Sequence, residues 1–367
     1  MSGRRNVLVT SRSFSSGSRD LLGELRAAGL TVVRGPTDHR LHELRPLLAD
    51  AVGWIAGTAP VTEDHLAAAP QLAVLARHGV GVDAVDLTSA AARGIVVTNT
   101  PGANTEAVAD LTVGLLLAVL RGIPAGDRRV RAGEWSVSRG RELGSSTVGL
   151  VGYGRIGRAV AERLRGFGAT LLAYDPMLDA AAIRAAGAEP ADLADLPRRC
   201  TAVSLHAPGG GRPLVDAEWL AGARDGLLLV NTARADLVDE PALAEALRAG
   251  TIAGYAADTL DTESTGAGSP LLAEDLADRV VLTPHLGAQT VEAIDRMGSL
   301  AVADLLAVLG GDTPKHPVRT AGGPGSASAS ASGSGSASGS GSASGSGSAS
   351  GSGSGSGSAS GSGSASG

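Results

Sequence analysis

The chain has 367 residues, a formal net charge of −6 and an aromatic content of only 2%. This length predicts one large or two medium domains rather than a single small core. The negative balance argues against nucleic acid as the main partner, because phosphate binding needs a basic surface. The sequence has no stretch of the roughly 20 apolar residues that span a bilayer, and its N-terminus has no secretory apolar region. Cys200 is the single cysteine, so no internal disulfide can form, and we expect a cytoplasmic protein without a membrane partner.

The first hundred residues alternate short apolar runs with helical patterns. Strands are expected at residues 7–10, 31–33, 54–55 and 72–75, and a helix at residues 20–28. Continuous apolar strands separated by helices predict a parallel sheet that is covered on both faces.

The segment 106–121 is apolar on nearly all faces. A helix of this kind must be buried, either in the core of its own domain or against a second subunit. Both interpretations remain open from the sequence.

A second alternating series begins at Thr147. Strands are expected at residues 148–151, 170–174, 202–205, 227–230, 252–256 and 280–282, followed by a helix at residues 290–309 that returns to the first unit. Such a series is typical of a doubly wound α/β sheet. Residues 321–367 are almost entirely Gly, Ser and Ala, have nothing to bury, and predict a disordered tail.

A glycine-rich loop follows the first strand of this second series. Its residues are Gly152, Tyr153, Gly154, Arg155, Ile156 and Gly157, and a helical pattern follows. This strand, G-x-G-x-x-G and helix context predicts a dinucleotide site, with the diphosphate at the helix N-terminus near the amides of Arg155 and Ile156. Asp175 ends the next strand, where a carboxylate accepts hydrogen bonds from a ribose and repels a 2′-phosphate. The predicted cofactor is NAD.

Three polar side chains follow later strands of the series. Arg234 comes after the strand at 227–230, Glu263 after the strand at 252–256, and His285 after the strand at 280–282. Separately, they could be a surface cation, a solvated carboxylate and a strand-end histidine with a structural role. Open α/β sheets bind ligands at the carboxyl ends of their strands, so their shared placement favours a catalytic site.

Seven segments carry a resemblance to a known family. They are Arg77 to Asp83, Asn99 to Gly102, Gly152 to Gly157, Leu205 to Pro208, Asn231 to Arg234 with Asp239 and Glu240, Asp258 to Glu263, and Pro284 to Ala288. In order and spacing they resemble the D-isomer-specific 2-hydroxyacid dehydrogenase family, and most of all its D-3-phosphoglycerate dehydrogenase branch.

The resemblance implies a role for each matching residue. His285 would be the general acid and base, and Glu263 would raise its pKa above the reference of about 6.5. Arg234, with the loop of Gly79, Val80 and Gly81, would bind the substrate carboxylate. The implied cofactor contacts are Val80, Gly152, Gly154, Arg155, Ile156, Gly157, Asp175, His206, Ala207, Thr232, Ala233, Asp258 and Gly287. No metal site is predicted.

The family's architecture implies a Rossmann NAD-binding domain, residues 101–289, inserted into a flavodoxin-like substrate domain, residues 1–100 with 290–320. Family members commonly dimerise, so a homodimer is expected. The predicted activity is reversible hydride transfer between NADH and a small 2-oxo acid, with phosphohydroxypyruvate as one candidate. Residues 55–60 contain no arginine for a phosphate, although Arg77, Arg131 or a residue of a second subunit could replace it. The alternative function is an NAD(H)-sensing regulator, similar to the corepressors built on this fold.

Overall fold

The structure is a computed structural model that describes residues 5–262 and 268–318. The expectations for Glu263 and for the tail at 321–367 therefore lie outside the described residues. Within the described part, the strands form two sheets, and every pairing between named strands is parallel. The predicted α/β class is confirmed.

The first sheet has five strands in the order β2-β1-β3-β4-β5. Its strands are β1 (Asn6–Val9), β2 (Thr31–Arg34), β3 (Ala51–Ala56), β4 (Val74–Arg77) and β5 (Val96–Thr98). The helices between them are α1 (Leu21–Ala27), α2 (Leu41–Leu48), α3 (Glu63–Ala67) and α4 (Leu87–Ala92). The strand order reverses between β1 and β3, which is the flavodoxin-like form of the doubly wound sheet.

The second sheet has seven strands in the order β12-β11-β10-β9-β6-β7-β8. Its strands are β6 (Thr147–Val151), β7 (Thr170–Tyr174), β8 (Glu189–Pro190), β9 (Ala202–Leu205), β10 (Leu227–Asn231), β11 (Ile252–Ala257) and β12 (Val280–Leu282). The helices that follow β5 in the chain are α5 (Thr105–Arg121), α6 (Ile123–Arg131), α7 (Arg155–Gly166), α8 (Ala180–Ala185), α9 (Leu196–Arg199), α10 (Ala217–Ala221), α11 (Glu240–Ala249) and α13 (Val291–Gly310). Short 3-10 turns occur at Leu143–Ser145, Leu193–Asp195, Ala235–Leu237, Pro270–Leu272 and Glu274–Leu276. The order reverses between β6 and β9, as in the Rossmann arrangement, so ligands are expected there.

Apolar side chains alternate between the two faces of each sheet. In β1, Val7 and Val9 enter one buried cluster, while Leu8 enters another on the opposite face. In β6, Leu150 and Val151 divide in the same way. Each sheet is thus covered on both faces, which explains why the strands read as continuous apolar runs.

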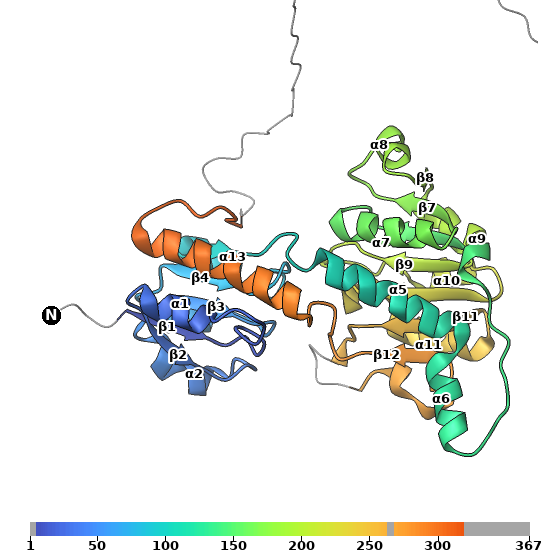
Figure 1. The fold of residues 1–367 in the computed structure, drawn as a ribbon, viewed down its shortest axis with the longest axis horizontal. Helices are drawn as coiled ribbons and strands as arrows, with labels where there is room; N and C mark the ends of the chain where they lie inside the picture. The colour runs from blue at the N-terminus through green and yellow to red at the C-terminus, as the bar shows by residue number, and fades with distance from the viewer. Residues whose placement is uncertain (1–4, 263–267, 319–367) are drawn as a thin grey trace, which may run out of the picture. The chain divides into compact units, whose positions relative to one another are not determined.

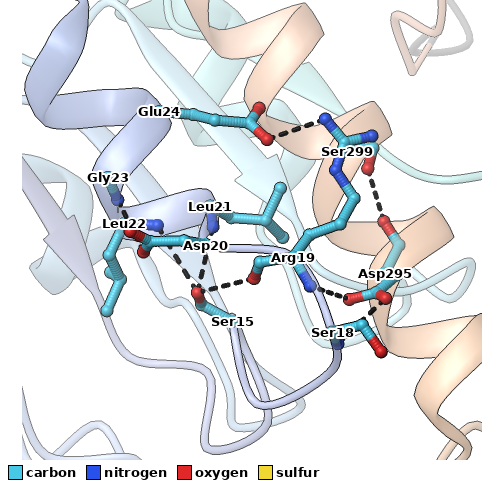
Figure 2. Close-up of polar contacts among 10 residues, drawn as sticks. All are labelled: Ser15, Ser18, Arg19, Asp20, Leu21, Leu22, Gly23, Glu24, Asp295 and Ser299. Atoms are coloured by element: carbon cyan, nitrogen blue, oxygen red, sulfur yellow. Dashed lines mark hydrogen bonds and ion pairs between the residues drawn. The ribbon is translucent and has the colours of Figure 1, made fainter.

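Helix α13 follows the second sheet in the chain but packs against β3, β4, β5 and α1 (Figure 1). Asp295 of α13 accepts hydrogen bonds from the backbone N–H groups of Ser18 (3.0 Å) and Arg19 (3.1 Å), which precede α1 (Figure 2). A Cβ on Gly298 would lie 2.1 Å from a methyl carbon of Leu21, so a larger residue here would force Leu21 to move. The returning helix predicted from the sequence is therefore present.

Helix α5 corresponds to the apolar segment 106–121. Eight of its residues are buried, and it packs on α7, β10 and β11. It is a core helix of this chain. No single helix in residues 5–262 and 268–318 is long and apolar enough to cross a bilayer. Helices α5 and α6 would pass that test only as a pair, which is bent by 59°.

Candidate active site

The glycine-rich loop joins β6 to α7 and brings the cofactor residues together. Gly152 has a φ of +90°, and a Cβ there would lie 2.7 Å from the backbone of both His206 and Ala207. A Cβ on Gly157 would lie 2.2 Å from the carbonyl oxygen of Gly152, so this glycine lets the helix approach the strand. Around Gly154 the described residues leave open space within 4 Å of an added Cβ.

The N-terminus of α7 fits a diphosphate. Gly154 is its N-cap and has no side chain to bond the first-turn amides. These N–H groups, including those of Arg155 and Ile156, carry the positive end of the helix dipole and suit an anion. The residues present therefore match what a bound dinucleotide requires at this loop.

Asp175 is held against the glycine loop by two backbone amides. One carboxylate oxygen accepts the N–H of Tyr153 (2.8 Å), and the other accepts the N–H of Met177 (2.9 Å). The carboxylate is thus fixed directly after β7, next to the loop that would hold the diphosphate.

His206 and Ala207 follow β9, the strand beside β6. The N–H of His206 donates to the carbonyl of Val151 at 2.7 Å, and its ring Nε2 lies 3.0 Å from the hydroxyl of Ser204. Burial lowers the pKa of His206 to about 4, so the ring is neutral at pH 7. It therefore brings no positive charge to the point between β6 and β9 where the strand order reverses.

The loop of Gly79, Val80 and Gly81 follows β4, and each of its carbonyl groups is bonded by a different donor. Thr100 N–H donates to Gly79 (3.0 Å), the Asn99 side chain donates to Val80 (2.7 Å), and Arg77 Nε donates to Gly81 (3.0 Å). In a trans peptide the N–H points away from the carbonyl. The N–H groups of residues 80–82 therefore face away from those donors, and no acceptor for them occurs in the described part of the chain. They are available to an anion.

Arg234 follows β10 through Thr232 and Ala233. Its Nη1 donates to the carbonyl of Ala233 at 2.8 Å, and its Nε and Nη2 face the carboxylate of Asp83. The hydroxyl of Thr232 lies 2.8 Å from that of Thr112 in α5. Because Thr112 donates to Val108, the shared proton belongs to Thr232.

Asp258, directly after β11, holds the segment that carries His285. Its buried carboxylate accepts the N–H groups of Leu286 and Gly287, both at 2.7 Å, and the hydroxyl of Thr283. His285 has a φ of +55°, a left-handed conformation that is costly for a residue with a Cβ. Asp258 thus offsets the strain of the turn after β12.

Glu263 lies outside the described residues, so its position relative to His285 is not described. Glu240, at the start of α11, bonds to a residue on each side of that segment. Its buried carboxylate accepts the N–H of Asp261 (2.9 Å) and the hydroxyl of Ser269.

Several contributors were missed at the sequence level. Asp83, Asn99 and Thr112 each contact a predicted site residue, and Asp83 and Thr112 reach theirs across more than a hundred positions of the chain. Asp83 and Asn99 lay within family-like segments, which gave the only local signal for them. Cys200 is buried, and burial raises the pKa of its thiol to about 12, so the thiol is protonated at pH 7. The described residues contain no group of three or more His, Cys, Asp or Glu side chains that could hold a metal.

Comparison with known proteins agrees with this geometry. A family model for the NAD-binding domain of D-isomer specific 2-hydroxyacid dehydrogenases matches residues 113–287. The glyoxylate reductase of Thermofilum pendens is 40% identical over 267 residues, which cover 70% of this chain and 78% of that protein. The chain belongs to the D-isomer specific 2-hydroxyacid dehydrogenase family.

Two further relatives show how the family match extends. The D-3-phosphoglycerate dehydrogenase of Mycobacterium tuberculosis is 41% identical over 295 residues, 79% of this chain but only 55% of that protein. The chain thus spans about half the length of this relative. The TT0316 protein of Thermus thermophilus superposes with a TM-score of 0.75 at 39% identity, covering 86% of this chain and all of that one. As a family member, the chain contains an NAD-binding domain around the second sheet.

Proposed function

We propose that this chain is an NAD-dependent D-2-hydroxyacid dehydrogenase that interconverts a small 2-oxo acid and its D-2-hydroxy acid. One observation carries the proposal. Arg234 and His285 follow β10 and β12, parallel strands of the sheet whose β6 leads into the glycine-rich loop. The names of the relatives, dehydrogenases and reductases, support it.

In this proposal Arg234 binds the substrate carboxylate. A guanidinium matches a planar carboxylate with two parallel charge-assisted hydrogen bonds. The N–H groups of Val80 and Gly81, which point away from the bonded carbonyls of Gly79 and Val80, bind the same group. Together they orient the neighbouring carbonyl carbon.

His285 acts as the general acid in reduction and as the general base in oxidation. NADH supplies the hydride when it is bound. His285 donates its proton to the carbonyl oxygen as negative charge develops there. Glu263 favours the charged form of the imidazole in this scheme.

The cofactor preference rests on Asp175. Its carboxylate beside the glycine loop suits the ribose hydroxyls of NAD and repels the 2′-phosphate of NADP. We expect NADH to be used at least tenfold better than NADPH, compared as kcat/KM. Equal use of the two would contradict this assignment.

The substrate belongs to the small 2-oxo acids. Relatives are named for phosphoglycerate and for glyoxylate, so both kinds must be tried. Arg77 is 5% exposed and bonds to the carbonyls of Gly81 and Ala56, and Arg131 pairs with Asp127 on α6. Neither arrangement favours a phosphate, and we expect an unphosphorylated substrate.

The test is NADH oxidation by the purified chain with glyoxylate, pyruvate, hydroxypyruvate, phosphohydroxypyruvate and bulkier 2-oxo acids. We expect turnover with at least one. Arg234→Ala should lower kcat/KM about 100-fold, because charge-assisted hydrogen bonds of about 3 kcal/mol are lost. Arg234→Lys is the control, since it keeps the charge without the fork and should recover only part of the rate. An unaffected rate in the alanine variant would refute the role of Arg234.

An NAD(H)-sensing regulator is the competing function. A sensor would bind NADH with wild-type affinity yet oxidise it with none of the 2-oxo acids. The panel therefore separates the two functions directly.

We also propose that residues 1–100 with 290–320 form the substrate domain and residues 101–289 the NAD domain. The packing of α13 on the first sheet supports this division.

We further propose a homodimer. Its support is a group of exposed apolar side chains, which we call the α6 arm, residues 123–137. Ile123, Val130, Trp135 and Val137 there are 57%, 47%, 81% and 94% exposed. Large apolar side chains left exposed along one short segment favour an interaction surface there.

A further inference from the structure

Asp83 contacts Arg234 of the candidate site and interacts electrostatically with a second arginine, Arg77. It follows the Gly79–Gly81 loop, whereas Arg234 follows β10. Arg234 Nε lies 3.3 and 3.2 Å from the two carboxylate oxygens, and its Nη2 lies 3.1 Å from the nearer one. Asp83 therefore accepts hydrogen bonds from both nitrogens, Nε and Nη2, on one edge of the Arg234 guanidinium.

The number of donors on Arg234 gives this contact a consequence. A guanidinium carries five N–H groups. Asp83 takes the one on Nε and one on Nη2, and the carbonyl of Ala233 takes one on Nη1. One N–H on Nη1 and one on Nη2 remain. We infer that the carbonyl of Ala233, one residue before Arg234, bonds the Nη1 N–H on the Cδ side, so that the remaining two N–H groups point parallel to each other from the end of the group. No acceptor for them occurs among the described residues.

The charges of Asp83 and its two neighbouring arginines also favour the contact between Asp83 and Arg234. Burial alone would raise the pKa of Asp83, but hydrogen bonding to Arg234 and its charge hold that pKa below the usual value. Burial lowers the pKa of Arg77 to about 10, Asp83 raises it and Arg234 lowers it again. Asp83 therefore offsets the repulsion between two nearby cations.

The loop is shaped around this pair. A Cβ on Gly81 would lie 1.9 Å from Nη2 of Arg234 and 3.0 Å from a carboxylate oxygen of Asp83. Because Gly81 has no side chain, the guanidinium lies close to the amides proposed to bind the substrate.

We propose that Asp83 is a positioning residue that fixes Arg234 so that its end-on pair of N–H groups meets the substrate carboxylate. The inference rests on the proposed function. The carboxylate does not react, so its binding is the same in the ground and transition states. Loss of Asp83 should then raise KM for the 2-oxo acid without a matching loss of kcat.

The test compares Asp83→Asn with the wild type and with Asp86→Asn. Asp86 is the N-cap of α4, where asparagine caps as well, so this control removes a nearby charge and keeps the fold. We expect Asp83→Asn to raise KM about tenfold, to change kcat less than threefold, and to leave the Kd of NADH unchanged. The same substitution in an Arg234→Ala background should add nothing further to KM.

Other outcomes overturn the inference. A lower KM would show that Asp83 competes with the substrate for Arg234. An unchanged KM, or an effect that persists in the Arg234→Ala background, would show that it does not act through Arg234.

Calorimetric binding of oxamate to the NADH complex repeats the comparison without turnover. Wild-type protein that binds oxamate but turns over no 2-oxo acid contradicts the proposed function alone. An Asp83→Asn variant that matches an active wild type contradicts only the inference.

Discussion

His39 illustrates how a single buried side chain ties the stability of this chain to pH. Its Nδ1 lies 3.0 Å from the carbonyl of Pro60, which can only accept, so Nδ1 carries the proton. Its Nε2 lies 2.7 Å from the hydroxyl of Thr10, which also accepts from Trp54. Burial lowers the pKa of His39 to about 4. The ring is neutral in the folded protein at pH 7.

This depressed pKa predicts a loss of stability in acid. Between pH 6.5 and 4 the unfolded chain binds a proton at His39 that the folded chain does not. The free energy of unfolding should therefore fall as the pH drops through this window, on the order of 1 kcal/mol per pH unit from this group. In His39→Asn, the free energy of unfolding, measured with urea at a series of pH values, should fall less steeply as the pH drops, because the titrating imidazole is gone. Asparagine tolerates the left-handed φ of 54° at this position, so the variant should keep the local backbone.

The matched control is His42→Asn. It removes the imidazole of a residue whose side chain is 79% exposed and should keep the wild-type slope. If His39→Asn also keeps the wild-type dependence of unfolding free energy on pH, then burial does not keep the folded protein from binding a proton at His39.

At the scale of elements, two glycines of the turn between β6 and α7 have different roles, one in cofactor binding alone and the other also in stability. Gly157 packs against the backbone of Gly152, whereas an added Cβ on Gly154 meets open space. Gly154→Ala should leave the Tm within a few degrees of the wild type but raise the Kd of NADH at least tenfold, because the methyl group occupies the approach to the diphosphate. Gly157→Ala should raise the Kd and also lower the Tm by several degrees, because helix and strand must separate. Fluorescence titration and thermal melts measure both. Equal Tm losses in the two variants would contradict the distinction.

The elements best predicted from sequence are those whose signal is local. Residues 170–174 and 202–205 were predicted to the residue, and the helix at 290–309 starts and ends one residue away from α13. Strands β5 and β8 were not predicted. They have three and two residues, too few for a periodic pattern. The strand predicted at 72–75 lies two residues later, at Val74–Arg77, since Leu72 is apolar because it packs in the core and not because it lies in the strand.

The residues of the candidate site also differ in whether their sequence signal is local. The glycine loop and Asp175 could be predicted because their geometry depends on neighbours in sequence. The role of Asp83 could not, since its partner Arg234 lies 151 positions away. Asp83 ends a family-like segment, but nothing in that segment indicates which residue its carboxylate contacts. Likewise, Asp258 was predicted as a cofactor contact, but its hold on the turn of His285 depends on pairing between β11 and β12.

At the scale of the whole molecule, the proposed homodimer depends on the α6 arm more than on α5. The faces of α5 are largely occupied within the chain, while Trp135 and Val137 lie in a segment, residues 131–142, whose side chains are all exposed. A buried aromatic anchor at an interface contributes about 2 kcal/mol or more, and a symmetric dimer would bury Trp135 twice, once from each subunit. Replacing both residues with serine should therefore raise the dimer dissociation constant at least 100-fold, measured by sedimentation velocity over a range of concentrations. Leu272→Ser, which changes an apolar side chain of 54% exposure outside the arm, should leave the dissociation constant unchanged. A wild-type chain that stays monomeric at high concentration, or a double variant that dimerises like the wild type, would exclude the α6 arm as the interface.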